Sequence, residues 1–364
     1  MTLVSPAPAR VASTARERER LTFRFVPHRL TSLLAGSLSL ALALPVFAQP
    51  APPVALEWKL STALGPAYPE GKAGAIWAEL IRERSAGRLS ARLFPGATLA
   101  QRDPGREFAA LRDGAIDLAV GSAAAWAPQV QELNLVALPW LVPDAGALDA
   151  LLQSPVAAQL AASVQAAGVV PLAWANNGFR ELATQRTIHA PSDLNGLTLR
   201  IAAAPLGVDT LVALGAKPTA LSATDALAAE RSGALDGEVT SVAAYRTART
   251  YAEGLAHLLL WGAHADALLF AVNRALWDGL SDADRDLLRQ AALDAAEQTS
   301  ALARQQADAA TLAELARQGA TVTRLTPAGK LPFREASHGV YERWAAVVGP
   351  DLVHAAETVF APRP

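Results

Sequence analysis

Two arginine side chains stand out in this sequence because each lies within an otherwise mostly apolar, strand-like segment. Arg180 belongs to the segment GFREL and Arg200 to LTLRI, twenty residues further on, and both segments lie beside turns. Burying a guanidinium group is unfavourable unless an anion meets it. Its planar fork of N–H donors fits a carboxylate bidentately, so two converging guanidinium groups would select a small carboxylate ligand. The alternative is a structural ion pair within the chain, for example with Glu181, Asp193 or Asp209.

The sequence contains no recognisable set of residues for a catalytic or metal site. Its six histidines lack i, i+4 pairing and a nearby acidic cluster, which favours structural or surface positions over metal ligation. The glycine motifs of nucleotide-binding proteins and of serine hydrolases are missing. Asp282 and Asp284 resemble paired catalytic carboxylates, but acidic residues are also favoured in the first turn of a helix, which is our interpretation. We therefore expect no catalytic residues, no metal, no cofactor and no enzymatic activity.

The composition is that of a globular protein with a large core. The chain has 364 residues, of which 51% are hydrophobic and 18% charged, enough for two domains. Residues 1–48 contain six arginines and two glutamates, so the remainder has 26 basic and 32 acidic residues, a net charge of −6. This mildly acidic part has no electrostatic reason to bind nucleic acid or an anionic membrane surface. The absence of cysteine excludes disulfides, thiolate metal ligands and cysteine nucleophiles.

The first 48 residues have the three parts of a secretory signal peptide. Five arginines between Arg16 and Arg29 precede an apolar run at 33–44, and Val46 and Ala48 are small residues placed for cleavage after Ala48. The run is shorter than the about 20 residues that span a membrane comfortably, and an uncleaved anchor is the alternative. We expect residues 1–48 to be removed on export and residues 49–55 to form a proline-rich linker.

Strands and helices alternate in the part of the chain that follows. A β-α-β-α-β order at its start predicts a mostly parallel sheet with helices on its faces. The expected strands are 56–63, 89–94, 116–120, 169–175, 179–183, 197–202, 255–260, 267–272 and 321–325. The expected helices are 72–85, 105–112, 144–167 with an interruption near Pro155, 206–214, one before the turn at 235–237, 333–348 and 351–360.

One long helix is predicted near the C-terminus. The segment 282–318 contains neither glycine nor proline and is rich in alanine, which predicts roughly 37 helical residues, about 55 Å if unbroken. Ser281 with Asp284 resembles a capping pair, and Gly319 is a natural stop. Such a helix is too long for one small domain, so we expect it to run along or across two. A coiled coil is the alternative, but the heptads are not sustained.

The order and spacing of several segments resemble the DctP-type solute-binding proteins of TRAP transporters. The matching segments are WKLST, GRLSARLFPGATL, LRDGAIDLAVGS, LPWL, NGFRELAT, DLNGLTLRI, LGAKPT and GALDGE, within residues 58–360. The resemblance implies an α/β, two-lobed periplasmic binding protein (class II-like) with a long helix spanning both lobes. Lobe I would comprise residues 56–177 plus 266–305, and lobe II residues 178–265 plus 306–360.

The resemblance also implies which residues bind a ligand. Arg200 matches the arginine that holds the ligand carboxylate bidentately in this family, and Arg180 matches one that commonly assists. Thr240 stands where the family usually has a ligand-contacting asparagine, and a hydroxyl offers less than an amide. Ala223 replaces a frequent aromatic residue, which makes a roomier and less polar pocket. The other residues expected to line the site are Thr62, Ser122, Trp126, Trp174, Asn177 and Tyr245, although aromatic residues at such places are as often part of the core.

The sequence thus predicts a periplasmic protein that captures a small organic carboxylate between its lobes. By resemblance, it would deliver this ligand to integral membrane TRAP subunits, acting as a monomer and without nucleic acid. The alternatives are a binding protein of another transporter class, a receptor that feeds a sensor kinase, and a secreted enzyme that acts on carboxylates. Monocarboxylates, dicarboxylates, sugar acids, keto acids and aromatic acids all carry the group that Arg200 would hold.

Overall fold

The computed structural model of the protein describes residues 56–361, apart from residues 203 and 222. All described residues belong to the unit formed by residues 52–364. The expected signal peptide and linker lie outside the described residues. Among the helices that the structure describes, none combines the length and the hydropathy of a transmembrane segment.

A single mixed sheet contains the nine described strands, in the order β2-β1-β3-β8-β4-β7-β5-β6, with β9 beside β8. Within each end of the sheet the strands run parallel to one another. At one end β1 pairs in parallel with β2 and β3, and at the other β5 pairs in parallel with β6 and β7. The strands are β1 (Leu56–Thr62), β2 (Leu89–Pro95), β3 (Leu118–Ser122), β4 (Val169–Thr184), β5 (Thr198–Ile201), β6 (Lys217–Ala220), β7 (Gly237–Thr240), β8 (His257–Asn273) and β9 (Thr321–Arg324).

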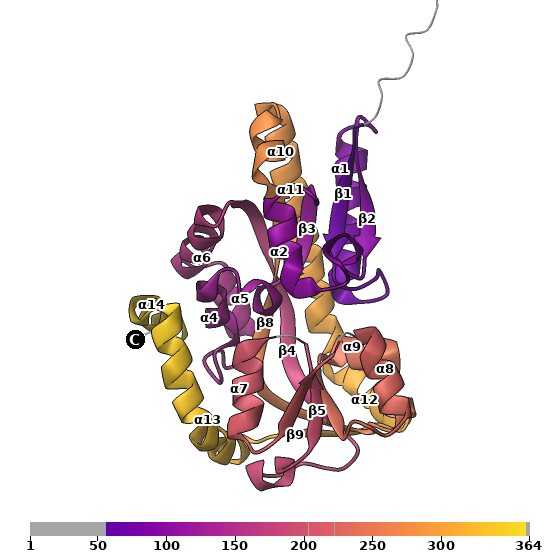
Figure 1. The fold of residues 1–364 in the computed structure, drawn as a ribbon, viewed down its shortest axis with the longest axis vertical. Helices are drawn as coiled ribbons and strands as arrows, with labels where there is room; N and C mark the ends of the chain where they lie inside the picture. The colour runs from indigo at the N-terminus through magenta and orange to yellow at the C-terminus, as the bar shows by residue number, and fades with distance from the viewer. Residues whose placement is uncertain (1–55, 203, 222, 362–364) are drawn as a thin grey trace, which may run out of the picture. The chain divides into compact units, whose positions relative to one another are not determined.

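Two long antiparallel strands, β4 and β8, join the two parallel ends (Figure 1). The sequence analysis split each of them in two, which is wrong. Gly178 has a φ of 74°, but it lies at a register shift between Asn176 and Phe179 and does not reverse the chain. Gly262, with a φ of 65°, occupies the equivalent irregular part of β8. Glycine tolerates positive φ in a β-bulge as readily as in a turn, so the residue type alone did not distinguish the two.

The helices predicted in the first half are present, and the break near Pro155 separates α5 from α6, whereas α3 and α4 were not expected. Pro155 is the first residue of α6, where a missing backbone N–H costs nothing. These helices are α1 (Pro69–Arg84), α2 (Pro104–Arg112), α3 (Ala123–Trp126), α4 (Asn134–Ala137), α5 (Ala145–Leu152) and α6 (Pro155–Ala166).

The middle of the chain contains two strands that the sequence analysis missed, β6 and β7. Gly237 of β7 was assigned to the turn at 235–237. The residues of β6 were expected to form a turn between two helices, and they include Pro218. The strand lies at the edge of the sheet, where Pro218 leaves no central ladder bond unmade. The remaining helices are α7 (Pro205–Ala213), α8 (Ala223–Arg231), α9 (Val242–Ala248), α10 (Arg274–Gly279), α11 (Asp282–Gln306), α12 (Ala309–Arg317), α13 (Pro327–Val348) and α14 (Pro350–Phe360).

The predicted long helix is broken, which corrects the expectation of one uninterrupted element. α11 ends at Gln306 and α12 begins at Ala309, because the carboxylate of Asp308 accepts a hydrogen bond from the Thr311 N–H at 2.8 Å. An aspartate can therefore either cap the start of a new helix or occupy a position inside a continuous one. α11 nevertheless packs against α1 and β4 and also contacts α9.

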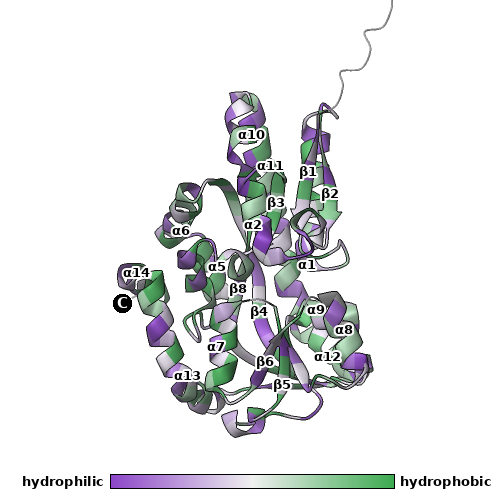
Figure 2. Ribbon diagram, in the orientation of Figure 1, coloured by the Kyte–Doolittle hydropathy of each residue, from purple (hydrophilic) through white to green (hydrophobic). Residues whose placement is uncertain are grey.

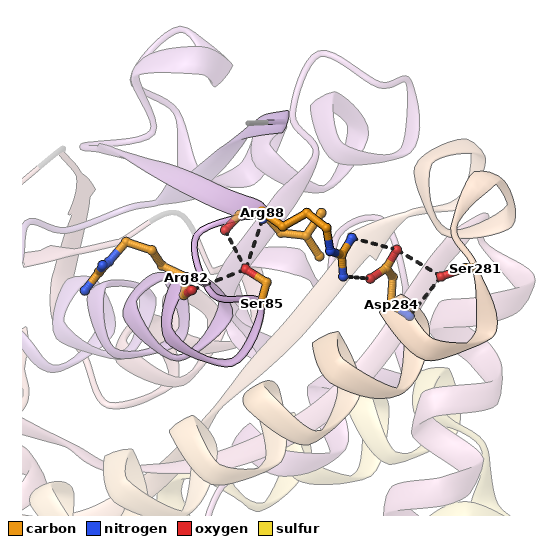
Figure 3. A network of polar contacts seen from close by, with 6 residues as sticks. Arg82, Ser85, Arg88, Ser281 and Asp284 are labelled. Atoms are coloured by element: carbon orange, nitrogen blue, oxygen red, sulfur yellow. Dashed lines mark hydrogen bonds and ion pairs between the residues drawn. The ribbon is translucent and has the colours of Figure 1, made fainter. Parts of the chain in front are cut away.

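The start of α11 is fixed by the predicted capping pair and by an ion pair to the start of β2. The Asp284 N–H donates to Ser281 Oγ at 3.2 Å, and Ser281 Oγ donates to the Asp284 carboxylate at 2.9 Å. Figure 3 shows Arg88 reaching the same carboxylate, while Ser85 Oγ bonds the backbone at the end of α1. This network connects α1, β2 and α11 at one end of the sheet.

The C-terminal helices contact helices of both predicted lobes. α13 packs against α7 and α4, and α14 packs against α5 and α6, although residues 306–360 were all assigned to lobe II. Figure 2 shows polar and apolar residues alternating along α13, whose buried residues include Phe333 and Val340. The lobe boundaries given above therefore stay a prediction.

Candidate functional site

Arg180 is paired with an aspartate that the sequence analysis did not single out. Its guanidinium donates to Asp266 Oδ2, and the two residues lie on β4 and β8, 86 positions apart in the chain. The Arg180 side chain remains 29% exposed, whereas that of Asp266 is 1% exposed. Arg180 therefore meets a buried anion of the protein itself.

Two further predicted ligand-binding residues converge on the same carboxylate. Ser122, at the end of β3, donates to Asp266 Oδ1 at 2.8 Å, and Asn177 Nδ2 donates to Oδ2 at 2.7 Å. Asp266 thus accepts from three side chains that come from two strands of the sheet. The predicted grouping of Ser122, Asn177 and Arg180 exists, with a protein carboxylate at its centre.

Arg200 lies at the other side of the site, on β5. Its side chain is 12% exposed, and its Nε donates to the Leu221 carbonyl at 3.0 Å. Nη1 is 3.6 Å from Glu238 Oε2 on β7, which is a long ion pair and exceeds hydrogen-bond distance. Burial lowers the pKa of Arg200, and the carboxylate of Glu238 acts in the opposite direction.

The two arginines are electrostatic neighbours. The positive charge of Arg180 is among the causes that lower the pKa of Arg200, while Glu230 on α8 raises it. Two cations that repel each other at a shared site favour an anion between them. The convergence of the two guanidinium groups on one ligand, expected from the sequence, stays a prediction.

The alternative partners considered from the sequence have other roles in the structure. Glu181 accepts from the Gly262 N–H, and Asp193 accepts from the backbone of residues 189 and 190. Asp209 accepts from Trp344 Nε1 at 2.9 Å. Ion pairs within the chain therefore exist for both arginines, but with Asp266 and Glu238.

Two buried carboxyl groups, those of Glu70 and Glu107, lie beside the end of β1. Glu70, at the start of α1, accepts from the Ala63 N–H. Ser61 Oγ donates to Glu107 Oε1 at 2.6 Å, whereas Glu107 Oε2 has no hydrogen-bond partner among the described residues. Burial, helped by the negative charges of Glu107 and Asp266, raises the pKa of Glu70 to about 8. Burial likewise raises the pKa of Glu107 to about 7.

The carboxyl groups near Arg200 are shifted in the same direction. Burial, followed by the charge of Glu238, raises the pKa of Glu230 to about 7. Burial also raises the pKa of Glu238, against the opposing effect of Arg200 and of hydrogen bonds from Thr240 and Thr250. Thr240 therefore acts on a neighbouring carboxyl group in this structure.

Stability is expected to fall as the pH rises from about 5 to about 8, in part because of Glu70. Its pKa is about 8 in the folded protein against an ordinary value of 4.5, so over this range the folded state holds a proton that the unfolded state has released. Each such group changes the free energy of unfolding by about 1.4 kcal/mol per pH unit. The protonated Glu70 side chain contributes its full stabilisation below the pKa of the unfolded state. This stabilisation is lost as the pH rises through the pKa of the folded state.

The measurement is urea unfolding at several pH values with Glu70→Gln, which keeps an acceptor for the Ala63 N–H but does not titrate. We expect a shallower decline for this variant than for the wild type. Glu335→Gln, which changes an exposed glutamate on α13, is the matched control. An unchanged slope in Glu70→Gln would contradict the assignment.

The remaining predicted residues lie in other surroundings. Trp126 is fully buried in the core with its Nε1 unpartnered among the described residues, and Trp174 is half-buried against the same core. Tyr245 is fully buried and its hydroxyl donates to the Leu255 carbonyl at 2.9 Å. Thr62 donates to the Leu64 carbonyl. These four are not gathered around the arginines by any contact of the described residues, and their role as ligand contacts stays a prediction.

The two described cavities lie elsewhere. One, of about 380 Å³, is lined by residues of α13, α14 and the segment around Trp140, and another, of about 550 Å³, by residues around Arg246 and Gln318. Neither is lined by Arg180 or Arg200. The side chains and their charges, not a cavity, define the candidate site. Within residues 56–361, apart from 203 and 222, no group of histidine and acidic residues has the arrangement of a metal site.

Asp266 and Glu238 are the residues that sequence reasoning missed. Asp266 is the one acidic residue in the apolar strand 257–273, and the argument that marked Arg200 applies to it equally. It lies between the two strands predicted for this segment, 255–260 and 267–272, so no expected strand contained it. Glu238 follows the Asp-Gly turn and was similarly outside any expected strand.

The mixed sheet and its crossing strands are those of a two-lobed solute-binding protein. The profile of the bacterial extracellular solute-binding proteins, family 7, matches residues 60–346. The chain belongs to this family, the DctP-type solute-binding proteins of TRAP transporters. The family consists of binding proteins for transport and not of enzymes.

Known relatives support this assignment along most of the chain. A crystal structure of a TRAP periplasmic solute-binding protein from Ralstonia eutropha, with bound (S)-2-acetolactate, is 46% identical with a TM-score of 0.82, covering 84% of this chain and 99% of that one. The C4-dicarboxylate-binding periplasmic protein DctP of Rhodobacter capsulatus is 26% identical over 336 residues, 92% of this chain and 98% of that protein. The uncharacterized protein y4mM of Sinorhizobium fredii is 32% identical over 187 residues, 51% of this chain, and this match spans 34% of that protein.

Proposed function

We propose that this protein captures a small organic carboxylate between its lobes in the periplasm and presents it to integral membrane TRAP subunits. Arg200 holds the ligand carboxylate, and Arg180 assists from β4. The protein acts as a monomeric carrier and catalyses no reaction on its ligand. Contacts from both lobes favour a closed form once the ligand is bound.

The observation that carries this proposal is the incomplete pairing of Arg200. Its side chain is largely buried, yet the described residues give it one hydrogen bond through Nε and one long ion pair at 3.6 Å. A guanidinium group has five N–H donors, and the two terminal nitrogens form the fork that fits a carboxylate. Among the described residues no acceptor is recorded within hydrogen-bond distance of this fork, so it is available to a ligand carboxylate.

The relatives agree with an anionic organic ligand. The 46% identical protein from Ralstonia eutropha holds a hydroxy keto acid. Export agrees with the basic and apolar segments of residues 1–48, and two of the relatives named above, from Ralstonia eutropha and Rhodobacter capsulatus, are called periplasmic.

A thermal-shift screen against a library of organic acids tests the proposal. The protein is purified from the periplasm of an expression host, and its mass tests cleavage after Ala48. A ligand at about 100 times its Kd adds about 2.7 kcal/mol to the free energy of unfolding. We expect at least one carboxylate, with (S)-2-acetolactate included, to raise Tm. A library without any stabilising carboxylate would contradict the proposal, and turnover of a carboxylate followed by NMR would favour a secreted enzyme.

A further inference from the structure

We propose that the site selects a singly charged carboxylate with an uncharged polar remainder, and that Asp266 is the residue that disfavours a second carboxylate. This inference rests on the proposed function and narrows its ligand class. It assigns to Asp266 a role in specificity that follows from its position beside Arg180.

The first argument is that only one of the two guanidinium groups is free to neutralise a ligand. Arg180 already donates to Asp266, whose carboxylate is almost completely buried and also accepts from Ser122 and Asn177. Removing Arg180 from this arrangement would leave a buried, unpaired carboxylate, which is costly. The charge of Arg180 is therefore neutralised by a protein anion, so Arg180 can assist only through its remaining N–H donors, and Arg200 is the group left to neutralise the ligand.

The second argument is the number of carboxyl groups around the two arginines. Glu70 interacts electrostatically with Arg180, Asp266 and Glu107. On the opposite side, Arg200 interacts with Glu238 and Glu230. Two cations thus share the site with five carboxyl groups, but burial raises the pKa of Glu70, Glu107, Glu230 and Glu238, which favours their neutral form. A ligand with two carboxylates would direct its second charge toward Asp266, a buried carboxylate that already holds Arg180, and like charges repel at low dielectric.

The third argument concerns what the site offers to the rest of the ligand. The described side chains around the arginines include the hydroxyl of Ser122, the amide of Asn177 and the hydroxyl of Thr240. The oxygen atoms of these groups can accept from a ligand hydroxyl, and the second N–H of Asn177 can donate to a keto oxygen, whereas a second carboxylate has no hydrogen to donate. A hydroxy or keto monocarboxylate therefore fits the chemistry of this site better than a dicarboxylate of the same size.

The test compares pairs of ligands that have the same shape but differ by one charge. (S)-2-Acetolactate is paired with 2-hydroxy-2-methylmalonate, in which a carboxylate replaces the acetyl group, and succinamate is paired with succinate. Titration calorimetry at neutral pH measures Kd for the full exported protein. We expect the singly charged member of a binding pair to bind at least about tenfold more tightly. In Asp266→Asn, we expect this ratio to fall by about tenfold.

Asp278→Asn is the matched control, because it removes one negative charge from an exposed aspartate on α10. It is expected to leave both affinities and the ratio within each pair unchanged. If Asp266→Asn fails to fold in a thermal melt, the wild-type ratios still decide. A doubly charged ligand that binds as tightly as its singly charged partner would overturn the inference.

The failure of the inference and the failure of the proposed function look different. If no carboxylate of the library binds, the proposed function fails, and the inference fails with it. If carboxylates bind but the wild-type preference for a single charge is missing, only the inference fails. If none of the four paired ligands binds but other acids do, the charges of those acids decide whether the inference holds. Doubly charged acids among the ligands that bind would overturn it.

Discussion

Arg200→Ala is expected to abolish carboxylate binding while leaving the protein folded. Truncating one partner of a buried guanidinium–carboxylate pair costs about 3–5 kcal/mol, which is more than about a hundredfold in Kd. Titration calorimetry with a ligand from the library screen measures this loss. Retained affinity would contradict the assignment of Arg200.

The fold is expected to tolerate this change because of the neighbouring carboxyl group. Removing Arg200 leaves Glu238 without its nearest cation, but burial already raises the pKa of Glu238, so the group can bind a proton and avoid an unpaired charge. The Leu221 carbonyl loses its Nε donor, which is a cost of about 1–3 kcal/mol at most if it stays buried. Far-ultraviolet circular dichroism and a thermal melt check the fold.

Two further variants make the Arg200 experiment specific. Arg200→Lys keeps the positive charge but loses the planar fork, so we expect weakened binding by about tenfold or more. Arg231→Ala removes an exposed arginine that pairs with Glu253 on the same side of the molecule, and it is expected to bind like the wild type. Equal losses in Arg200→Ala and Arg231→Ala would indicate a non-specific charge effect.

Gly121→Ala is expected to destabilise the protein strongly and to weaken binding as well. A Cβ atom at Gly121 would overlap Cε2 and Cζ2 of the Trp126 ring, which is fully buried and packs edge-to-face on Phe108 with ring centroids 5.6 Å apart. Overpacking of this kind costs about 1–3 kcal/mol and occasionally more. Because the next residue, Ser122, donates to Asp266, a shifted β3 would also disturb the site.

Urea unfolding measures the first effect of Gly121→Ala, and calorimetry with a library ligand measures the second. Gly279→Ala is the matched control, since a Cβ atom there meets nothing within 4 Å. It should change the free energy of unfolding by no more than about 0.5 kcal/mol. If both glycine variants are equally stable, the backbone at Gly121 can move away from the ring and the packing argument is wrong.

Local patterns in the sequence predicted most elements correctly. The alternation from β1 to β3, the break before α6 and the Ser281 cap depend on neighbouring residues, which one-dimensional reasoning can read. The other elements depend on contacts between residues that are distant in the chain. Asp308 is acceptable inside a helix or as a cap, and Gly178 fits a turn or a bulge, so only the packing around them selects one outcome.

The two arginines of the candidate site could be predicted from the sequence, but the carboxylates that pair with them could not. Arg180 and Arg200 were recognisable because each is charged within an apolar strand, and the resemblance to a family gave them a role. Asp266 lies 86 residues from Arg180, and no local pattern relates two positions so far apart in the chain. Glu238 lies nearer to Arg200, but the parallel pairing of β5 and β7 brings them together.

The place of β8 in the sheet also orders the folding of the chain. In the strand order, β8 lies between β3 and β4, so without it the path consists of two separate pieces, β2-β1-β3 and β4-β7-β5-β6. These pieces are made from residues 56–240, whereas β8 begins at His257. During synthesis from the N-terminus, local strand pairing can precede the arrival of β8, but the two pieces cannot join before it. Arg180 also lacks Asp266 until then, so the binding site is among the last parts of the molecule to form.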